Sequence, residues 1–132
     1  MKMVLASARR KTARARVILR DGRGRVFVNG TPLEILEPEV IRLKIMEPLR
    51  LAGSLAEKVD IYAEAEGGGI VSQASAIRTA IARALVEWSG SEELKKLYLA
   101  YDRRLLVEDP RQAEPKKPRG RSARAKRQKS YR

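Results

Sequence analysis

The chain has 132 residues, of which 29 are Lys or Arg and 16 are Asp or Glu, so its formal net charge is +13. It contains neither cysteine nor histidine, which excludes disulfides, thiolate metal sites, a cysteine nucleophile and the commonest general base. No apolar run in the sequence approaches the roughly 20 residues that a transmembrane helix needs.

The positive charge lies at the two ends of the chain. Residues 1–20 carry seven basic residues and no acidic one, a net charge of +7. Residues 21–107 carry 12 basic and 13 acidic residues, a net −1, and residues 108–132 carry ten basic and three acidic, a net +7. We therefore interpret residues 1–107 as a globular body with a basic amino-terminal strand, and residues 108–132 as an extended basic tail. Such ends attract phosphate backbones or anionic lipid.

The amino-terminal part of the body predicts a strand with an arginine-rich face. Alternation begins within residues 3–8, so this segment is interpreted as part of the fold rather than as a mitochondrial transit peptide or a secretory signal. It continues as a strand over Thr12–Arg20, which places Arg14, Arg16 and Arg20 on one face. The sequence therefore predicts a basic stripe on a sheet.

A turn at Asp21–Gly24 separates this strand from a second extended run. Arg25–Val28 is predicted to form the second half of a hairpin, which Asn29–Gly30 closes. The apolar segment Val40–Met46 predicts a short helix. We expect this helix to end before Pro48, because proline disfavours the helical conformation of the residue that precedes it.

The second half of the body predicts one strand and two helices. Val59–Glu66 alternates between apolar and polar residues, and Gly67–Gly69 follows it. The next helix has apolar residues at intervals of three and four, which predicts a buried stripe of Ala74, Ile77, Ile81, Leu85 and Trp88. This helix is expected to end at Ser89–Gly90. Ser91 is suited to cap another helix, with a stripe of Leu94, Leu97, Tyr98 and Tyr101.

Two groups of residues could carry chemistry, and neither supports an enzyme. Gly67–Gly69 precedes a helix as a phosphate loop would, but it lacks both the Gly-Lys-Ser/Thr ending of the Walker pattern and the third glycine of the dinucleotide pattern. It is interpreted as a flexible turn or as a contact to an RNA phosphate. Glu64 and Glu66 lie on one strand face, as paired carboxylates could, but alternation alone explains them as a solvated face. We predict no catalytic residue, metal site or cofactor.

The basic ends predict binding to RNA. Sequence-specific DNA readers usually present a recognition helix, whereas the basic residues here lie on a strand and in the tail. This arrangement favours recognition of the backbone and shape of folded RNA. A general nucleic-acid packaging protein is the alternative that shares the charge pattern. A phosphate-handling enzyme built on the glycines fits less well, and so does a membrane-surface protein, because the tail has no apolar anchors.

Several short segments follow one another in a recognisable order and spacing: Arg10–Ala13, Val28–Glu34, Gly67–Gly69, Ala76–Arg78, Tyr101–Val107, Asp109–Arg111 and Gln128–Arg132. Together they resemble the small-subunit ribosomal protein S-nine family, in its archaeal and eukaryotic branch. The resemblance extends over nearly the whole chain. The absence of a long amino-terminal extension is typical of the archaeal type.

The resemblance implies a fold and a function. The fold would be α/β, more strictly α+β, with one small domain in which helices pack on a sheet of about four strands. It would contain a left-handed β-α-β crossover like that of ribosomal S-five domain two. Such crossovers are usually right-handed. The protein would be a structural constituent of the small-subunit head in cytoplasmic ribosomes. Its partners would be small-subunit rRNA, the peptidyl-site (P-site) tRNA and neighbouring head proteins, with no membrane and no small-molecule substrate.

The charge pattern and the resemblance together assign contact residues. Expected rRNA contacts come from the first strands, the glycines, one helix and the tail: Arg9, Arg10, Lys11, Arg14, Arg16, Gly67, Gly68, Gly69, Arg78, Lys116, Lys117, Arg119, Arg121, Arg124, Lys126 and Arg127. The resemblance implies contacts to the anticodon stem-loop of the P-site tRNA from Lys129, Tyr131 and Arg132. The segment Arg119–Ala125 has more arginine and less glycine than the family's tail, so a stiffer and more cationic tail is expected.

Overall fold

The computed structural model describes residues 3–36 and 38–107, so the predicted tail lies outside the described residues. The described chain forms strands β1 (Met3–Arg10), β2 (Ala13–Asp21), β3 (Val26–Val28), β4 (Thr31–Pro32) and β5 (Val59–Glu66), and helices α1 (Glu39–Ala52), α2 (Ile70–Ser89) and α3 (Glu92–Tyr101). The predicted α+β class is confirmed, and the fifth strand is the two-residue β4. Within this part of the chain, none of the helices combines the length and the apolar character that crossing a membrane requires.

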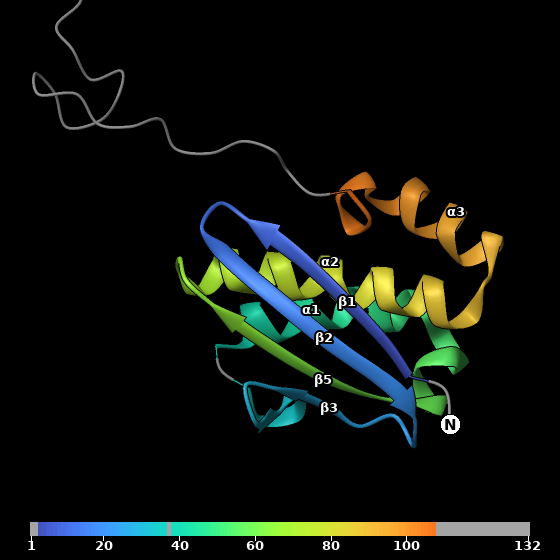
Figure 1. The fold of residues 1–132 in the computed structure, drawn as a ribbon, viewed down its shortest axis with the longest axis horizontal. Helices are drawn as coiled ribbons and strands as arrows, with labels where there is room; N and C mark the ends of the chain where they lie inside the picture. The colour runs from blue at the N-terminus through green and yellow to red at the C-terminus, as the bar shows by residue number, and fades with distance from the viewer. Residues whose placement is uncertain (1–2, 37, 108–132) are drawn as a thin grey trace, which may run out of the picture.

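The strands form one mixed sheet in the order β1-β2-β5-β3-β4. Neighbouring strands are antiparallel except β3 and β5, which are parallel. The chain passes from β3 to β5 through α1. In Figure 1 both strands run leftward at the front, α1 returns behind the sheet, and β5 lies above β3, so the crossover is left-handed.

The predicted hairpin of the Thr12–Arg20 strand with Arg25–Val28 is wrong, because β5 lies between these two segments. The hairpin partner of β2 is β1, through a tight turn in which Lys11 has a φ of 54°. Asn29–Gly30 does close a hairpin, but it joins β3 to β4, and both residues have the positive φ that a type I′ turn requires. A local turn signal cannot reveal a strand that inserts from elsewhere in the chain.

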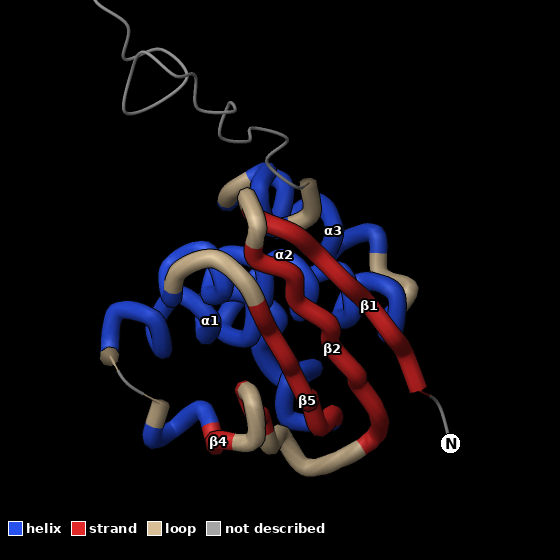
Figure 2. The backbone as a smooth tube through the Cα atoms, turned by 60° about the vertical axis from the view of Figure 1, so that its left-hand side comes forward, coloured by secondary structure: helices blue, strands red, loops and turns tan. Residues whose placement is uncertain are grey.

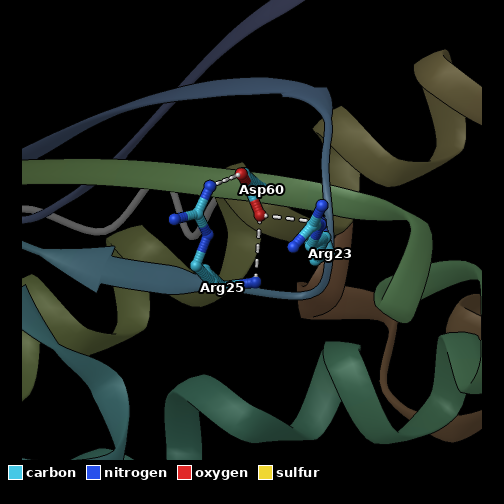
Figure 3. A network of polar contacts seen from close by, with 3 residues as sticks. All are labelled: Arg23, Arg25 and Asp60. Atoms are coloured by element: carbon cyan, nitrogen blue, oxygen red, sulfur yellow. Dashed lines mark hydrogen bonds and ion pairs between the residues drawn. The ribbon is translucent and has the colours of Figure 1, made fainter.

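Asp60 holds the connection from β2 to β3 across the start of β5 (Figure 3). Its carboxylate accepts hydrogen bonds from the backbone N–H groups of Arg23 at 3.0 Å and Arg25 at 3.1 Å, and from Nη2 of Arg25 at 2.9 Å. Asp60 is 3% exposed, and the Arg25 guanidinium and the backbone donors lower its pKa to about 2. A side chain at Gly22 would collide with this carboxylate. One buried acid therefore fixes the loop.

Helices α1 and α2 cover one face of the sheet, with the strands on the other side in Figure 2. α2 packs on β1 and β2, and its buried residues include five alanines, which allow the helix to approach the sheet closely. The predicted stripe of α2 is confirmed except that Trp88 is only partly buried. In α3, Leu94 and Tyr98 are buried as predicted, whereas Leu97 and Tyr101 are exposed.

Helix α1 is longer than predicted, because it continues through Pro48 to Ala52. Proline lacks the backbone N–H that a helix interior uses, which normally ends or kinks a helix. Pro48 is buried, and its carbonyl oxygen accepts a hydrogen bond from the Tyr98 hydroxyl at 2.7 Å. Tyr98 is fully buried, and this burial raises its pKa well above the ordinary range. Packing of Pro48 against Tyr98 of α3 thus offsets the tendency of proline to end the helix.

Candidate nucleic-acid interface

The face of the sheet opposite α1 and α2 is turned toward the viewer in Figure 1. Its side chains are mostly exposed, and the strand register arranges them in rows that cross the strands. In one row, Arg9 of β1 pairs with Arg14 of β2, which pairs with Glu66 of β5. In the next row, Arg16 of β2 lies opposite Glu64 of β5. The register therefore brings three of the predicted rRNA-contacting arginines together on one exposed surface. We call Arg9, Arg14 and Arg16 the arginine cluster.

The electrostatics of the arginine cluster favour an anion on its β1 side. Like charges directly opposite each other on neighbouring strands are destabilising, and Arg9 and Arg14 form such a pair. On the β5 side, Nη2 of Arg16 lies 3.9 Å from Oε2 of Glu64, but both side chains are about three-quarters exposed, at 76% and 74%. Such an exposed pair is weak, so Arg16 can exchange Glu64 for another anion. Strand β1 carries no acidic residue. A groove of about 720 Å³ crosses this end of the face.

The glycines lie at the same end of the body as the arginine cluster. Gly67 and Gly68 have φ values of 77° and 62°, and a Cβ at Gly67 would lie 2.6 Å from the carbonyl oxygen of Thr12. Close packing of this loop against the β1–β2 turn therefore requires both glycines. The turn interpretation accounts for them, and their contact to RNA stays a prediction. Gly69 precedes α2, whose first turn has no acidic residue, so the positive end of the helix dipole adds to the charge here.

The other predicted residues of the first strands do not share the open face. Arg10 is half-buried and lies on the helix side. Burial and the charge of Arg78 lower the pKa of Lys44 in α1, and Arg10 lowers it further, which places these cations near one another. Lys11 is exposed in the β1–β2 turn, beside the arginine cluster.

Arg78, a predicted rRNA contact, lies inside the body with its side chain 10% exposed. Its Nε donates to Oε2 of Glu47 at 2.8 Å, and its Nη2 donates to Oδ2 of Asp102 at 3.0 Å. The guanidinium therefore joins α1, α2 and the residue after α3. In the described body its donors are directed at protein carboxylates, so we leave Arg78 out of the interface.

Sequence reasoning missed the role of Arg83. Its Nε donates to the carbonyl oxygen of Leu106 at 2.8 Å, and its Nη1 donates to that of Ser7 at 3.0 Å. This side chain attaches the last described turn to the edge strand β1. Leu106 is 23 positions away from Arg83 in the sequence and Ser7 is 76 positions away, so no short-range pattern could have predicted these contacts. The predicted contacts at Lys116, Lys117, Arg119, Arg121, Arg124, Lys126, Arg127, Lys129, Tyr131 and Arg132 lie outside the described residues.

These features define a class of protein: a small basic α+β domain with a cationic open sheet face, whose described residues include no group that could hold a metal ion. The family model described as "Ribosomal protein S9/S16" matches residues 8–132, and the chain belongs to this family. Ribosomal proteins of this kind are structural constituents of the small subunit and not enzymes, so both predictions are confirmed. The predicted location, in the ribosome and in the cytoplasm, is confirmed with them.

Three archaeal relatives carry the name "Small ribosomal subunit protein uS9". The protein of Saccharolobus solfataricus is 56% identical over 99% of this chain and 96% of its own length. That of Methanothrix thermoacetophila is 50% identical over the full length of both chains. That of Desulfurococcus amylolyticus is 51% identical over all of this chain and 94% of its own length. The predicted archaeal type of the family is confirmed.

Proposed function

We propose that the body binds small-subunit rRNA in the head of the subunit through the arginine cluster, Lys11 and the Gly67–Gly69 loop. The single observation that carries this proposal is the register that sets Arg9 directly opposite Arg14 beside Arg16, on a strand pair whose outer member has no acid. Arginine offers a planar fork of donors that suits phosphate oxygens. Phosphates placed between these side chains would relieve the repulsion that the fold leaves in the free protein.

The tail continues this binding mode in the proposal. Lys116, Lys117, Arg119, Arg121, Arg124, Lys126 and Arg127 would contact rRNA, and Lys129, Tyr131 and Arg132 would contact the anticodon stem-loop of the P-site tRNA. Arg83 supports this arrangement, because it attaches Leu106, next to the tail, to the strand that carries Arg9. A fully extended segment of 25 residues spans about 80–90 Å, enough to reach an RNA distant from the body. Neighbouring head proteins would complete the surroundings.

Binding of the body is tested with the triple variant Arg9→Gln, Arg14→Gln, Arg16→Gln. A matched control, Arg50→Gln, Lys95→Gln, Lys96→Gln, removes the same charge at exposed positions on α1 and α3. We expect the triple variant to lower affinity for a head-domain rRNA fragment and to reduce the slope of log affinity against log salt by about 0.7–0.9 for each lost phosphate contact. Equal losses in both variants would contradict the proposal, since they would mean that only net charge matters.

Contact to the tRNA is tested by removing the last four residues, Lys129–Arg132. Small subunits that contain this shortened chain should assemble normally and bind P-site tRNA modestly more weakly, because two charged contacts are lost while the body is unchanged. Unchanged tRNA affinity in assembled subunits would rule out the proposed contact.

A further inference from the structure

A second surface lies on the same open face, beyond the arginine cluster. The rings of Phe27 in β3 and Tyr62 in β5 are stacked, with centroids 5.4 Å apart and planes 8° from parallel. The guanidinium carbon of Arg20 in β2 lies 4.8 Å from the centroid of the Tyr62 ring. Because β2 and β3 flank β5 on opposite sides, Phe27 and Arg20 approach this ring from opposite sides.

A groove of about 440 Å³ runs beside Tyr62 on its β2 side. Leu5 and Ile18 line it and are 66% and 40% exposed. Tyr62 and Ile18 pair across the strands, so the aromatic ring stands directly beside an apolar surface. The body's own core lies on the other face of the sheet and does not use these side chains.

We propose that this groove binds an unpaired RNA base, which stacks on Tyr62. The proposal rests on the RNA binding proposed above and extends it from phosphate contacts to a base. Arg20 now covers the ring face that the base would take. Arg20 is exposed on a long side chain, so it can move to the outer face of the base or to a neighbouring phosphate. Aromatic rings and guanidinium planes are the surfaces on which proteins stack splayed RNA bases.

The charges around the groove favour RNA over a protein partner. Arg16 and Arg20 lie on the same strand face, one row to either side of the Ile18–Tyr62 row. Four residues at about 3.3 Å each separate them by roughly 13 Å. A nucleotide whose base occupies the middle row would therefore have Arg16 and Arg20 on either side for its flanking phosphates. Glu64 also lines the groove, and Arg16 would exchange its exposed pairing with Glu64 for a phosphate. Aromatic stacking combined with a basic groove is the arrangement that proteins use for single-stranded nucleic acid.

The test compares the affinity of the full chain for two fluorescently labelled RNAs, an oligomer of ten adenosines and an oligomer of ten abasic nucleotides. Both carry the same phosphates, so the tail and the arginine cluster contribute to both alike. We expect the adenosine oligomer to bind about 5- to 100-fold more tightly, the range that one stacked base gives. Tyr62→Leu should abolish this preference, and Tyr62→Phe should keep it.

Tyr101→Leu on α3 serves as the control, because this exposed tyrosine lies away from the groove and should leave the preference intact. Thermal unfolding of each variant checks that the body is folded, and the comparison of the two oligomers on the unchanged protein needs no variant. Equal affinity for both oligomers would overturn the stacking site and leave the proposed phosphate binding in place. Failure to bind either oligomer would overturn both proposals.

Two further outcomes would also overturn the stacking site. A preference that is kept in Tyr62→Leu would locate stacking elsewhere. Alternatively, Tyr62→Leu could reduce incorporation into small subunits while the preference for bases is unchanged. The groove would then be a docking surface for a neighbouring protein.

Discussion

Asp60 offers the most specific test of how the sheet is assembled. The Asp60→Asn variant keeps the size of the side chain and one oxygen that can accept from the backbone of Arg23 and Arg25. It removes the negative charge and turns an amide N–H₂ toward the Arg25 guanidinium, in place of the oxygen that now accepts at 2.9 Å. Because Asp60 is 3% exposed, water cannot easily replace the lost interaction.

The magnitude follows from the pKa. Asp60 titrates at about 2 in the folded chain, against an ordinary value of 3.8, and each pH unit of such a difference corresponds to about 1.4 kcal/mol. The ionised carboxylate therefore stabilises the fold by about 2 kcal/mol at neutral pH. Because the folded pKa is depressed, this stabilisation is fully present above pH 4 and is lost as the pH falls toward 2.

The assay is chemical denaturation of the full chain and of Asp60→Asn at pH 7, 4, 3 and 2. We expect the free energy of unfolding of the variant to be lower by about 2 kcal/mol at pH 7, a decrease in Tm of roughly 8–16 °C for a domain of this size. The difference should shrink between pH 4 and 2. Asp21→Asn, an exposed acid at the end of β2, should change stability little. A difference that is absent at pH 7, or that does not depend on pH, would refute the reasoning.

Three further substitutions test separate features. Arg78→Met should lower the free energy of unfolding by about 1–3 kcal/mol, because it removes the guanidinium that pairs with the partly buried carboxylates of Glu47 and Asp102. The affinity of the folded variant for rRNA should stay the same, and a selective loss of that affinity would return Arg78 to the interface. Tyr98→Phe should cost about 1–3 kcal/mol in urea unfolding, since the Pro48 carbonyl loses its donor, and a neutral effect would discount that bond. Gly67→Ala should lower the free energy of unfolding by more than about 1 kcal/mol, because Gly67 has a positive φ and its Cβ would meet the carbonyl oxygen of Thr12. Gly69→Ala should be tolerated, since nothing lies near its Cβ position. Equal effects of the two substitutions would contradict this account of the packing.

Periodicity in the sequence predicted the individual elements well. The alternation of Val59–Glu66 appears as strand β5, and that of Thr12–Arg20 appears, shifted by one residue, as strand β2. The stripe of α2 appears as the core-facing side of that helix. These predictions succeed because one buried face imposes a period of two on a strand and of 3.6 on a helix. The cap at Ser91 was also predictable, and its hydroxyl oxygen accepts a hydrogen bond from the backbone N–H of Leu94 at 3.2 Å.

The order of the strands could not be predicted from local pattern. Insertion of β5 between β2 and β3 depends on contacts such as Asp60 to Arg25, which are 35 positions apart in the chain. Alternation placed Asp60 with Glu64 and Glu66 on an exposed face, yet the crossing loop buries it. Likewise, proline disfavours the helical conformation at the residue before Pro48, but this is a local effect, and the packing of Tyr98 on Pro48 outweighs it.

The candidate site could be predicted only in part, because strand pairing also decides which residues share a face. Alternation places Arg14 and Arg16 on one face, but only the β1–β2 register adds Arg9 to them and turns Arg10 away. Charge alone does not distinguish an exposed arginine from one that pairs within the body, as Arg78 does with Glu47 and Asp102. The stacked pair of Phe27 and Tyr62 was not predictable, because it joins two strands that are distant in sequence.

Ultraviolet cross-linking of intact small subunits, followed by mass spectrometry of the peptides that carry nucleotide adducts, tests the central claim most directly. The account predicts adducts on the open sheet face, within residues 7–18 and at Tyr62, on the 67–69 loop and in the tail, and none on the exposed residues of α3. Adducts on α1 and α3 with an unmodified sheet face would show that the body binds rRNA through its helical side, which would contradict the account.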